Sequence, residues 1–195
     1  MNDYSTISKS ICEYCNLSYS KGLVVAHSGN ISVRLSSELI LTTPTLFSKQ
    51  RLEPRDLVIC DMNSNVLDGY NKPSSEIGTH LAIYSTNSDI NAIIHTHPPY
   101  LCSYLYEGKL PNRDISFESQ YWLKDLLLVP QFEPGSSSLS DFILSNKEKK
   151  ALLYLLIKHG LFACGKSLQE AWWRTEIMEN CSMINHLIDS RNING

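Results

Sequence analysis

The chain has 195 residues, which is enough for one domain with its own buried core. Hydrophobic residues make up 43% and charged residues 19%, and the formal net charge of −3 gives no electrostatic reason to expect a nucleic-acid partner. The first ten residues lack the basic and apolar regions of a signal peptide, and no apolar run approaches the roughly 18 residues of a membrane span. We therefore expect a single cytoplasmic domain over residues 1–195, with a small molecule or a protein as partner and no membrane association.

Six cysteines raise the question of disulfides or of a cysteine metal site. Cys12 and Cys15 have the C-x-x-C spacing, but no second pair follows them. Both fall in a predicted first helix over residues 5–19, where they are expected to be small core residues rather than zinc or redox ligands. The other four cysteines are scattered along the chain and are expected to be reduced core thiols.

Two hairpins are predicted after this first helix. Gly29 and Asn30 form a polar corner before an alternating apolar strand at 31–35, and a second strand follows at 38–44. The pattern DLVICDMNSNVLDG at 56–69 predicts a further strand, turn and strand. On local grounds alone, the glycine and asparagine of the corner indicate ordinary turn chemistry.

The sequence SSE at 74–76 precedes a predicted helix with apolar residues at helical spacing. Glu76 is expected in its first turn, where a carboxylate is commonly favourable with the helix dipole and serines commonly act as caps. A functional interpretation stays open, because the hydroxyls and free N–H groups of a helix start can bind a phosphate while Glu76 faces a metal. His80, one turn later, is expected on the helix surface.

Residues 89–97 are rich in isoleucine and are followed by Pro98-Pro99, so they are predicted to form a buried strand. Side chains two positions apart in a strand share a face, and His95 and His97 therefore point the same way. Two imidazoles held like this can chelate one divalent ion, provided that a third ligand is present. The alternative is that both are partly exposed side chains at a strand end, and the spacing alone does not decide between the two.

Downstream, short helices are predicted near residues 100–105 and 118–124, a buried strand at 126–132, and another helix through Phe142 and Leu144. The apolar run at 151–158 has no decisive period, but the turn signal at His159-Gly160 and the strand pattern after it favour a strand. Residues 167–170, SLQE, are a capping box that opens the last helix. His159 thus lies at a corner between two strands, from which it could reach the histidine pair.

Six motifs, in this order and spread over nearly the whole chain, resemble the class II aldolase and adducin-head family, most nearly its L-fuculose phosphate aldolase type: SGNISVR, LTTPT, PSSE, IIHTHPP, VPQFEPGS and IKHGLFACGKSLQEA. The resemblance implies a three-layer α/β/α fold around a central, largely antiparallel sheet. It also implies a cyclic homotetramer with active sites at subunit interfaces. His95, His97 and His159 would then bind zinc or another divalent ion, with Glu76 as a further ligand or as the base.

The same resemblance implies reversible cleavage of a phosphorylated, fuculose-1-phosphate-like ketose into dihydroxyacetone phosphate and an aldehyde. A divalent ion bound to both substrate oxygens would stabilise the enediolate as a Lewis acid, and Glu76 would move a proton at the substrate carbon. The phosphate would be held mainly by N–H and hydroxyl donors of five residues, which are Gly29, Asn30, Thr45, Ser74 and Ser75.

The sequence departs from the aldolase pattern at two places. Leu46 stands where many members have glycine, which bears on how closely a phosphate can approach the backbone there. The tyrosine that fuculose phosphate aldolases use as proton donor has no clear match, so Tyr121 and Glu118 are the candidates for a second acid or base.

Several other functions stay open beside the aldolase. A sugar-phosphate dehydratase of the methylthioribulose-1-phosphate type, an epimerase or a decarboxylase would use the same metal site. The alternative from another class is a non-enzymatic, adducin-like interaction module. That alternative is disfavoured because the adducin head lacks the histidine set found here.

Overall fold

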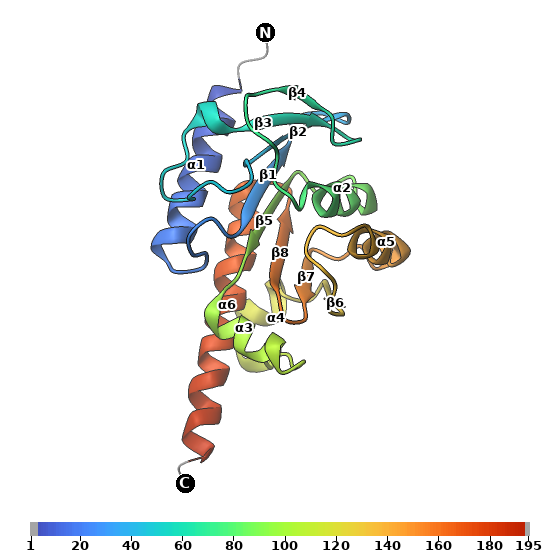
Figure 1. The fold of residues 1–195 in the computed structure, drawn as a ribbon. Helices are drawn as coiled ribbons and strands as arrows, with labels where there is room; N and C mark the ends of the chain where they lie inside the picture. The colour runs from blue at the N-terminus through green and yellow to red at the C-terminus, as the bar shows by residue number, and fades with distance from the viewer. Residues whose placement is uncertain (1–3, 194–195) are drawn as a thin grey trace.

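The computed structural model describes residues 4–193, with side-chain detail up to residue 191. Its strands form one sheet in the order β4-β3-β2-β1-β5-β8-β7-β6 (Figure 1). Neighbouring strands run antiparallel, except for the parallel pair of β6 and β7. The predicted, largely antiparallel sheet is therefore confirmed. The strands are β1 (Asn30–Arg34), β2 (Leu39–Thr42), β3 (Val58–Asp61), β4 (Val66–Asp68), β5 (Ala92–Thr96), β6 (Leu126–Val129), β7 (Leu153–Leu156) and β8 (Gly160–Gly165).

Helices cover both faces of the sheet, as Figure 1 shows. Helices α2 and α5 pack with one buried apolar cluster on one face, and α1, α3, α4 and α6 pack with two clusters on the other. The three-layer α/β/α arrangement is as predicted. The helices are α1 (Ser5–Ser20), α2 (Ile77–Thr86), α3 (Pro99–Tyr106), α4 (Phe117–Trp122), α5 (Ser137–Ser145) and α6 (Leu168–Ile193), with short 3-10 turns at Pro54–Asp56, Arg113–Ile115 and Lys147–Lys149.

Strand β5 lies near the middle of the sheet and is buried on both faces. Ile93 belongs to the core under α2 and α5, whereas Ala92 and Ile94 belong to the core under α1 and α6. A strand buried on both faces has no polar side to alternate with, which explains the isoleucine-rich run. By the same alternation, His95 points to the face that α2 covers.

Several of the expected boundaries differ from the structure, among them two that lie next to prolines. The strand predicted at 126–132 ends at Val129, lies at the edge of the sheet and leaves Leu128 38% exposed. It ends before Pro130 because proline has no N–H for the ladder. The prolines after β5 do end that strand, but Pro99 is also the first residue of α3, where a missing N–H costs no helical hydrogen bond.

Helix α6 is the longest helix described, and its last turns extend beyond the body of the molecule (Figure 1). Half of the predicted capping box forms, since Ser167 Oγ accepts from Glu170 N at 3.3 Å. The carboxylate of Glu170 accepts from Lys166 N at 3.2 Å, one residue before the expected donor. Within residues 4–193, no helix combines the length and the apolar character that crossing a membrane needs.

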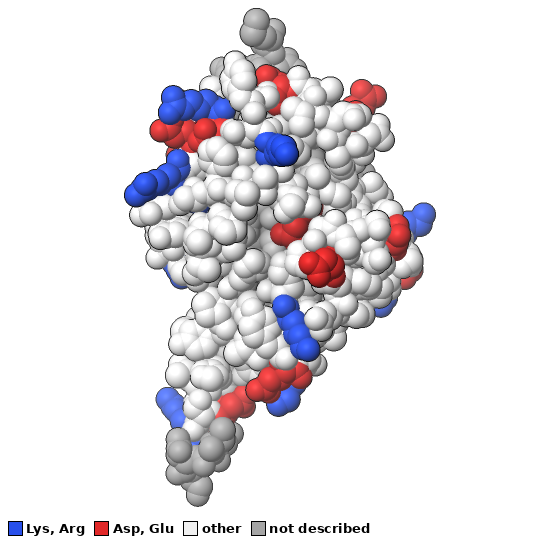
Figure 2. Space-filling view, in the orientation of Figure 1, with Lys and Arg blue, Asp and Glu red and all other residues white. Residues whose placement is uncertain are grey.

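The cysteines of the chain are free thiols, as predicted. Burial is the main cause that raises the pKa of Cys12 to about 11 and that of Cys15 to about 12, so both stay protonated at neutral pH. On the face shown in Figure 2, lysines and arginines alternate with aspartates and glutamates and form no broad patch of one sign.

Candidate active site

Three histidines from the centre of the sheet meet at one point. His95 is in β5, His97 follows its end, and His159 is in the turn between β7 and β8. Because β5 and β8 are paired neighbours, this turn lies beside the end of β5. One nitrogen from each imidazole lies within 4.8 Å of the others. The structure thus brings the three predicted metal ligands together.

Hydrogen bonds settle which nitrogen of His95 faces its neighbours. Its Nδ1 donates to the carbonyl oxygen of Leu161 at 2.9 Å, so Nε2 carries the lone pair. That Nε2 lies 3.0 Å from Nε2 of His97 and 3.1 Å from Oε2 of Glu76. A lone pair opposite a carboxylate oxygen is unfavourable unless a cation lies between them. The donor set therefore fits a divalent ion, for which neutral imidazoles and a carboxylate are ordinary ligands.

Burial keeps these side chains in the form that binds metal. Burial and the nearby His95 lower the pKa of His97 to about 3 and that of His159 to about 4, so both are neutral at pH 7. Burial by itself would raise the pKa of Glu76, but the neighbouring His95 and His159 and the hydrogen bond that Asn30 Nδ2 donates to Oε2 hold it well below its usual range. Glu76 Oε1 and His159 Nδ1 are buried without a hydrogen-bond partner among the described residues.

Glu76 lies at the N-cap of α2 rather than in its first turn, because the helix begins at Ile77. Ser74 Oγ accepts from Glu76 N at 3.2 Å in a local serine turn, but α2 has no side-chain cap hydrogen bond, so the predicted serine cap does not form. Oε1 of the Glu76 carboxylate lies 3.7 Å from Nε2 of His159. Its position one residue outside the helix thus directs the carboxylate towards the histidines instead of the helix dipole.

The five residues predicted to hold a phosphate surround one small cavity. Its volume is about 170 Å³, and Glu76 and His97 lie at its wall. Gly29 closes one side at φ 70°, where a β-carbon would come within 2.8 Å of the carbonyl oxygen of His95. The loop therefore reaches the histidine strand only because this residue has no side chain. The five are Gly29, Asn30, Thr45, Ser74 and Ser75.

Lys49 lines the same cavity, although no feature of the sequence distinguished it. It is 2% exposed, and its Nζ donates to the carbonyl oxygens of His27, at 3.2 Å, and Phe47, at 2.9 Å. Burial lowers its pKa. One lysine therefore joins the two loops that frame the cavity, in addition to the N–H and hydroxyl donors expected there.

Leu46 also lines the cavity, with φ 59° and a side chain that is 74% exposed. A residue with a β-carbon pays roughly 1–2 kcal/mol for this left-handed conformation, whereas glycine adopts it freely. The backbone here thus has the geometry that glycine favours, and the leucine side chain projects from the rim of the cavity.

The prediction for His80 was wrong, because this residue is fully buried. Helix α2 packs on the sheet with α5 beside it, and its apolar residues are buried around most of its circumference. His80 consequently faces β1, where its imidazole is hydrogen-bonded to Ser32 and Asn30. The helical spacing of Glu76 and His80 was a usable signal, but it did not show how deeply the helix is buried.

Glu118 and Tyr121 lie elsewhere, on the exposed surface of α4. Glu118 borders a cavity against α6, and the ring of Tyr121 lies under the Lys124 ammonium at 5.7 Å. Neither residue lines the cavity beside the histidines. Within one chain, the structure therefore does not bring these two candidates to the site.

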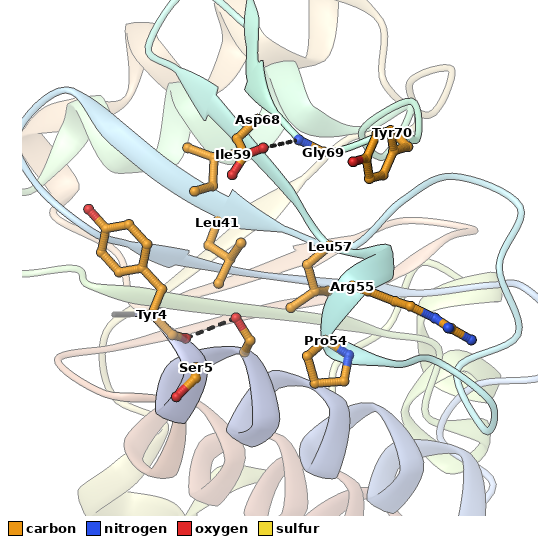
Figure 3. Close-up of a pocket in the computed structure, with 11 residues that line it drawn as sticks. Tyr4, Ser5, Leu41, Pro54, Arg55, Leu57, Ile59, Asp68, Gly69 and Tyr70 are labelled. Carbon is orange, nitrogen blue, oxygen red and sulfur yellow. Dashed lines mark hydrogen bonds between the residues drawn. The ribbon is translucent and has the colours of Figure 1, made fainter. Parts of the chain in front are cut away.

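A larger cavity of about 310 Å³ lies between the start of α1 and the hairpin of β3 and β4 (Figure 3). Arg55 and Asp68 are among its lining residues, but Asp68 accepts from the N–H of Gly69 at 2.8 Å, as the dashed line shows. The lining contains no histidine. The smaller cavity is therefore the candidate site, because it lies beside the three histidines that could hold a metal ion.

Comparison with known proteins agrees with this geometry. The family model described as Class II Aldolase and Adducin N-terminal domain matches residues 9–186. An L-fuculose phosphate aldolase of Methanococcus maripaludis is 33% identical over 90% of this chain and 94% of its own. A 3-oxo-tetronate 4-phosphate decarboxylase of Haemophilus influenzae is 35% identical over 85% of this chain and 80% of its own. The crystal structure of a sugar-phosphate aldolase from Thermotoga maritima has a TM-score of 0.82, with 25% identity and 94% of both chains covered.

Proposed function

The chain belongs to the class II aldolase and adducin family, and on this premise we propose that it is a zinc-dependent aldehyde-lyase. It would reversibly cleave a phosphorylated ketose similar to fuculose 1-phosphate into dihydroxyacetone phosphate and an aldehyde. The observation that carries the proposal is the convergence of three histidine nitrogens within 4.8 Å beside a cavity lined by hydroxyl and N–H donors. This convergence also disfavours a non-enzymatic interaction module.

Each residue of the site has a role in this proposal. His95, His97 and His159 would hold the ion, which when bound supplies a Lewis acid for the negative charge that carbon–carbon cleavage leaves on the substrate oxygens. Glu76 would move the proton at the substrate carbon, since its carboxylate is ionised, buried and has one oxygen without a partner among the described residues.

The cavity would hold the substrate phosphate at a distance from the breaking bond. Its serine and threonine hydroxyls supply neutral donors, and Lys49 fixes the two loops that carry Gly29 and Thr45. A phosphate held by such donors fixes the substrate chain in one orientation relative to Glu76.

A second candidate is a decarboxylase, favoured by the 35% identity to a 3-oxo-tetronate 4-phosphate decarboxylase and by Leu46, which departs from the glycine of many aldolases. Loss of carbon dioxide from a 3-oxo acid leaves the same kind of charge beside a carbonyl group. The site would need the same ion and the same phosphate pocket, so geometry alone favours neither reaction.

A substrate panel separates these candidates. Zinc-loaded protein is incubated with dihydroxyacetone phosphate and short aldehydes, and in parallel with a 3-oxo-tetronate 4-phosphate. We expect a condensation product in the first assay and no carbon dioxide in the second. Carbon dioxide without condensation would replace the leading proposal by the second candidate, and the absence of both would contradict an aldolase or decarboxylase function.

We further propose a cyclic homotetramer with sites at subunit interfaces. Glu118 and Tyr121 are exposed on α4, away from the histidines of their own chain, so an acid–base role for either requires α4 of one subunit to face the cavity of another. Mixing Glu76→Gln subunits with Tyr121→Phe subunits tests this. If the mixture is more active than either variant alone, the site is shared between subunits. If the mixture is no more active, Tyr121 has no role in the reaction.

A further inference from the structure

Behind Glu76, four buried side chains of β1 and α2 form a continuous series of hydrogen bonds. The hydroxyl of Tyr84 lies 2.8 Å from Ser32 Oγ, which lies 2.7 Å from His80 Nδ1. His80 Nε2 is hydrogen-bonded to Asn30 Oδ1, and Asn30 Nδ2 donates to Glu76 Oε2 at 2.9 Å. The series therefore connects a tyrosine in the core with the carboxylate of the site.

The chemistry of the groups fixes the direction of every bond in the series. A carboxylate oxygen accepts, so the Asn30 amino group faces Glu76 and its carbonyl oxygen faces His80. That carbonyl can only accept, so His80 carries its proton on Nε2. His80 Nδ1 must then accept from the Ser32 hydroxyl, whose oxygen in turn accepts from Tyr84. Each link leaves one choice, which defines a single tautomer for His80.

We propose that His80 is a positioning residue for Glu76, acting through Asn30. In its Nε2–H tautomer it holds the Asn30 amide so that Glu76 Oε2 accepts the hydrogen bond from Asn30. Oε1 is then the oxygen left to move the substrate proton. Oε1 is buried, has no hydrogen-bond partner among the described residues, and lies 3.7 Å from His159 Nε2. This inference rests on the proposed function and adds to it the oxygen that acts and the residue that selects it.

The surroundings of His80 show why its position is rigid. Its imidazole is fully buried and makes an edge contact with Phe162 at a centroid distance of 5.3 Å, while Phe162 stacks on His95 at 4.0 Å. Tyr84, at the far end of the series, is held by the Arg34 guanidinium over its ring at 4.6 Å. A group locked in this way can orient Asn30 without reorganisation when a ligand binds.

The arrangement leaves room for the phosphate role predicted for Asn30. Its amino group has two protons, and the bond to Glu76 uses one of them. The second proton remains available to a ligand in the cavity that Asn30 lines. His80 would therefore position two functions of the site through a single amide.

The first test needs no substrate. Metal-free protein is labelled with ¹⁵N at histidine, and a two-bond ¹H–¹⁵N correlation spectrum is recorded. In this spectrum, the ¹⁵N chemical shift of a ring nitrogen without a proton is well separated from that of a ring nitrogen that carries one. The His80 signals are assigned by their loss in His80→Gln. We expect a protonated Nε2 and an unprotonated Nδ1, and the opposite tautomer would overturn the proposal whatever reaction the protein catalyses.

The second test compares three variants at α2. His80→Leu removes the donor to Asn30, and we expect kcat to fall about 10- to 100-fold, with KM raised by a smaller factor through Asn30 and zinc content near the wild-type value. His80→Gln places an amide donor near the former Nε2 and should recover most of this loss. Thr79→Val is the matched control, because the neighbouring Thr79 is fully buried and its hydroxyl has no hydrogen-bond partner in the described part of the chain.

A wild-type kcat in His80→Leu would overturn the proposal, as would a His80→Gln variant no better than His80→Leu. Should His80→Leu fail to fold, the comparison of His80→Gln with Thr79→Val and the tautomer spectrum still decide. Failure of the proposed function has a different result, since the wild-type protein would then lack lyase activity while the spectrum still reports the tautomer.

Discussion

Gly160 lies directly against the imidazole of His97. A β-carbon at residue 160 would come 2.6 Å from His97 Cδ2 and 2.5 Å from the carbonyl oxygen of Thr96, both far below ordinary contact distances. The first residue of β8 therefore approaches the end of β5 only because it has no side chain. This contact holds His159, the preceding residue, beside His97.

Gly160→Ala should accordingly weaken both the fold and the metal site. Overpacking costs about 1–3 kcal/mol of unfolding free energy, and displacement of His97 should lower zinc affinity as well. Urea unfolding and a competitive zinc titration measure the two effects. Gly78→Ala in α2 is the control, because the added β-carbon meets only Ser140 Oγ at 3.6 Å and alanine favours a helix. Equal zinc affinity in wild type and Gly160→Ala would contradict this account.

Purified protein should carry about one zinc or similar divalent ion per chain, because three imidazoles converge on one point. His97→Ala should lose the ion, whereas His186→Ala, at an exposed histidine on α6, should keep it. Elemental analysis of protein produced in zinc-replete medium provides the measurement. Full occupancy in His97→Ala would refute the metal centre.

Glu76→Gln keeps the size of the side chain and removes the base. Metal content should survive, since the three histidines remain, while kcat falls by roughly 10² to 10⁴. Steady-state kinetics with dihydroxyacetone phosphate and a short aldehyde test this. A near-normal kcat with the ion bound would exclude Glu76 as the base and direct attention to Glu118 and Tyr121.

Two substitutions at the cavity should affect binding in opposite directions. Ser75→Ala removes a hydroxyl from the phosphate pocket and should raise KM more than it lowers kcat, because a contact far from the reacting bond contributes mostly uniform binding.

Leu46→Gly removes an exposed side chain from the rim of the same cavity, at a backbone conformation that suits glycine, so KM should fall. If both changes left KM unchanged, the cavity would not be the phosphate site.

The metal-free protein should lose stability as the solution becomes acidic. Burial lowers the pKa of His80 to about 3, from an ordinary value near 6.5 that applies in the unfolded chain. Between these values the unfolded chain binds more protons, so stability is complete above about pH 6.5 and declines as the pH falls towards 3. Thermal unfolding from about pH 7 to about pH 5 measures the slope, and His80→Gln should make it shallower. An unchanged slope in this variant would show that His80 titrates normally.

Most of the secondary structure could be predicted because it follows from local periods. The isoleucine run of β5 predicts burial on both faces, and the two-residue period puts His95 and His97 on one side before any tertiary contact is considered. The turn at His159-Gly160 likewise places the third histidine at a corner between strands. The six family-like motifs extended these local predictions to the layer arrangement and to the set of residues around the cavity.

The tertiary structure alone decided how those residues act on one another. Burial of His80 depends on α2 packing with this residue against β1, and the position of Lys49 depends on two loops that meet only in the folded chain. The separation of α4 from the histidines is equally invisible in the local pattern. By itself, the sequence determined which side chains share a strand face or begin a helix, because these relations repeat every two or four residues. Packing across the sheet decided which nitrogen, oxygen or ammonium faces the site, because those contacts join segments far apart in the chain.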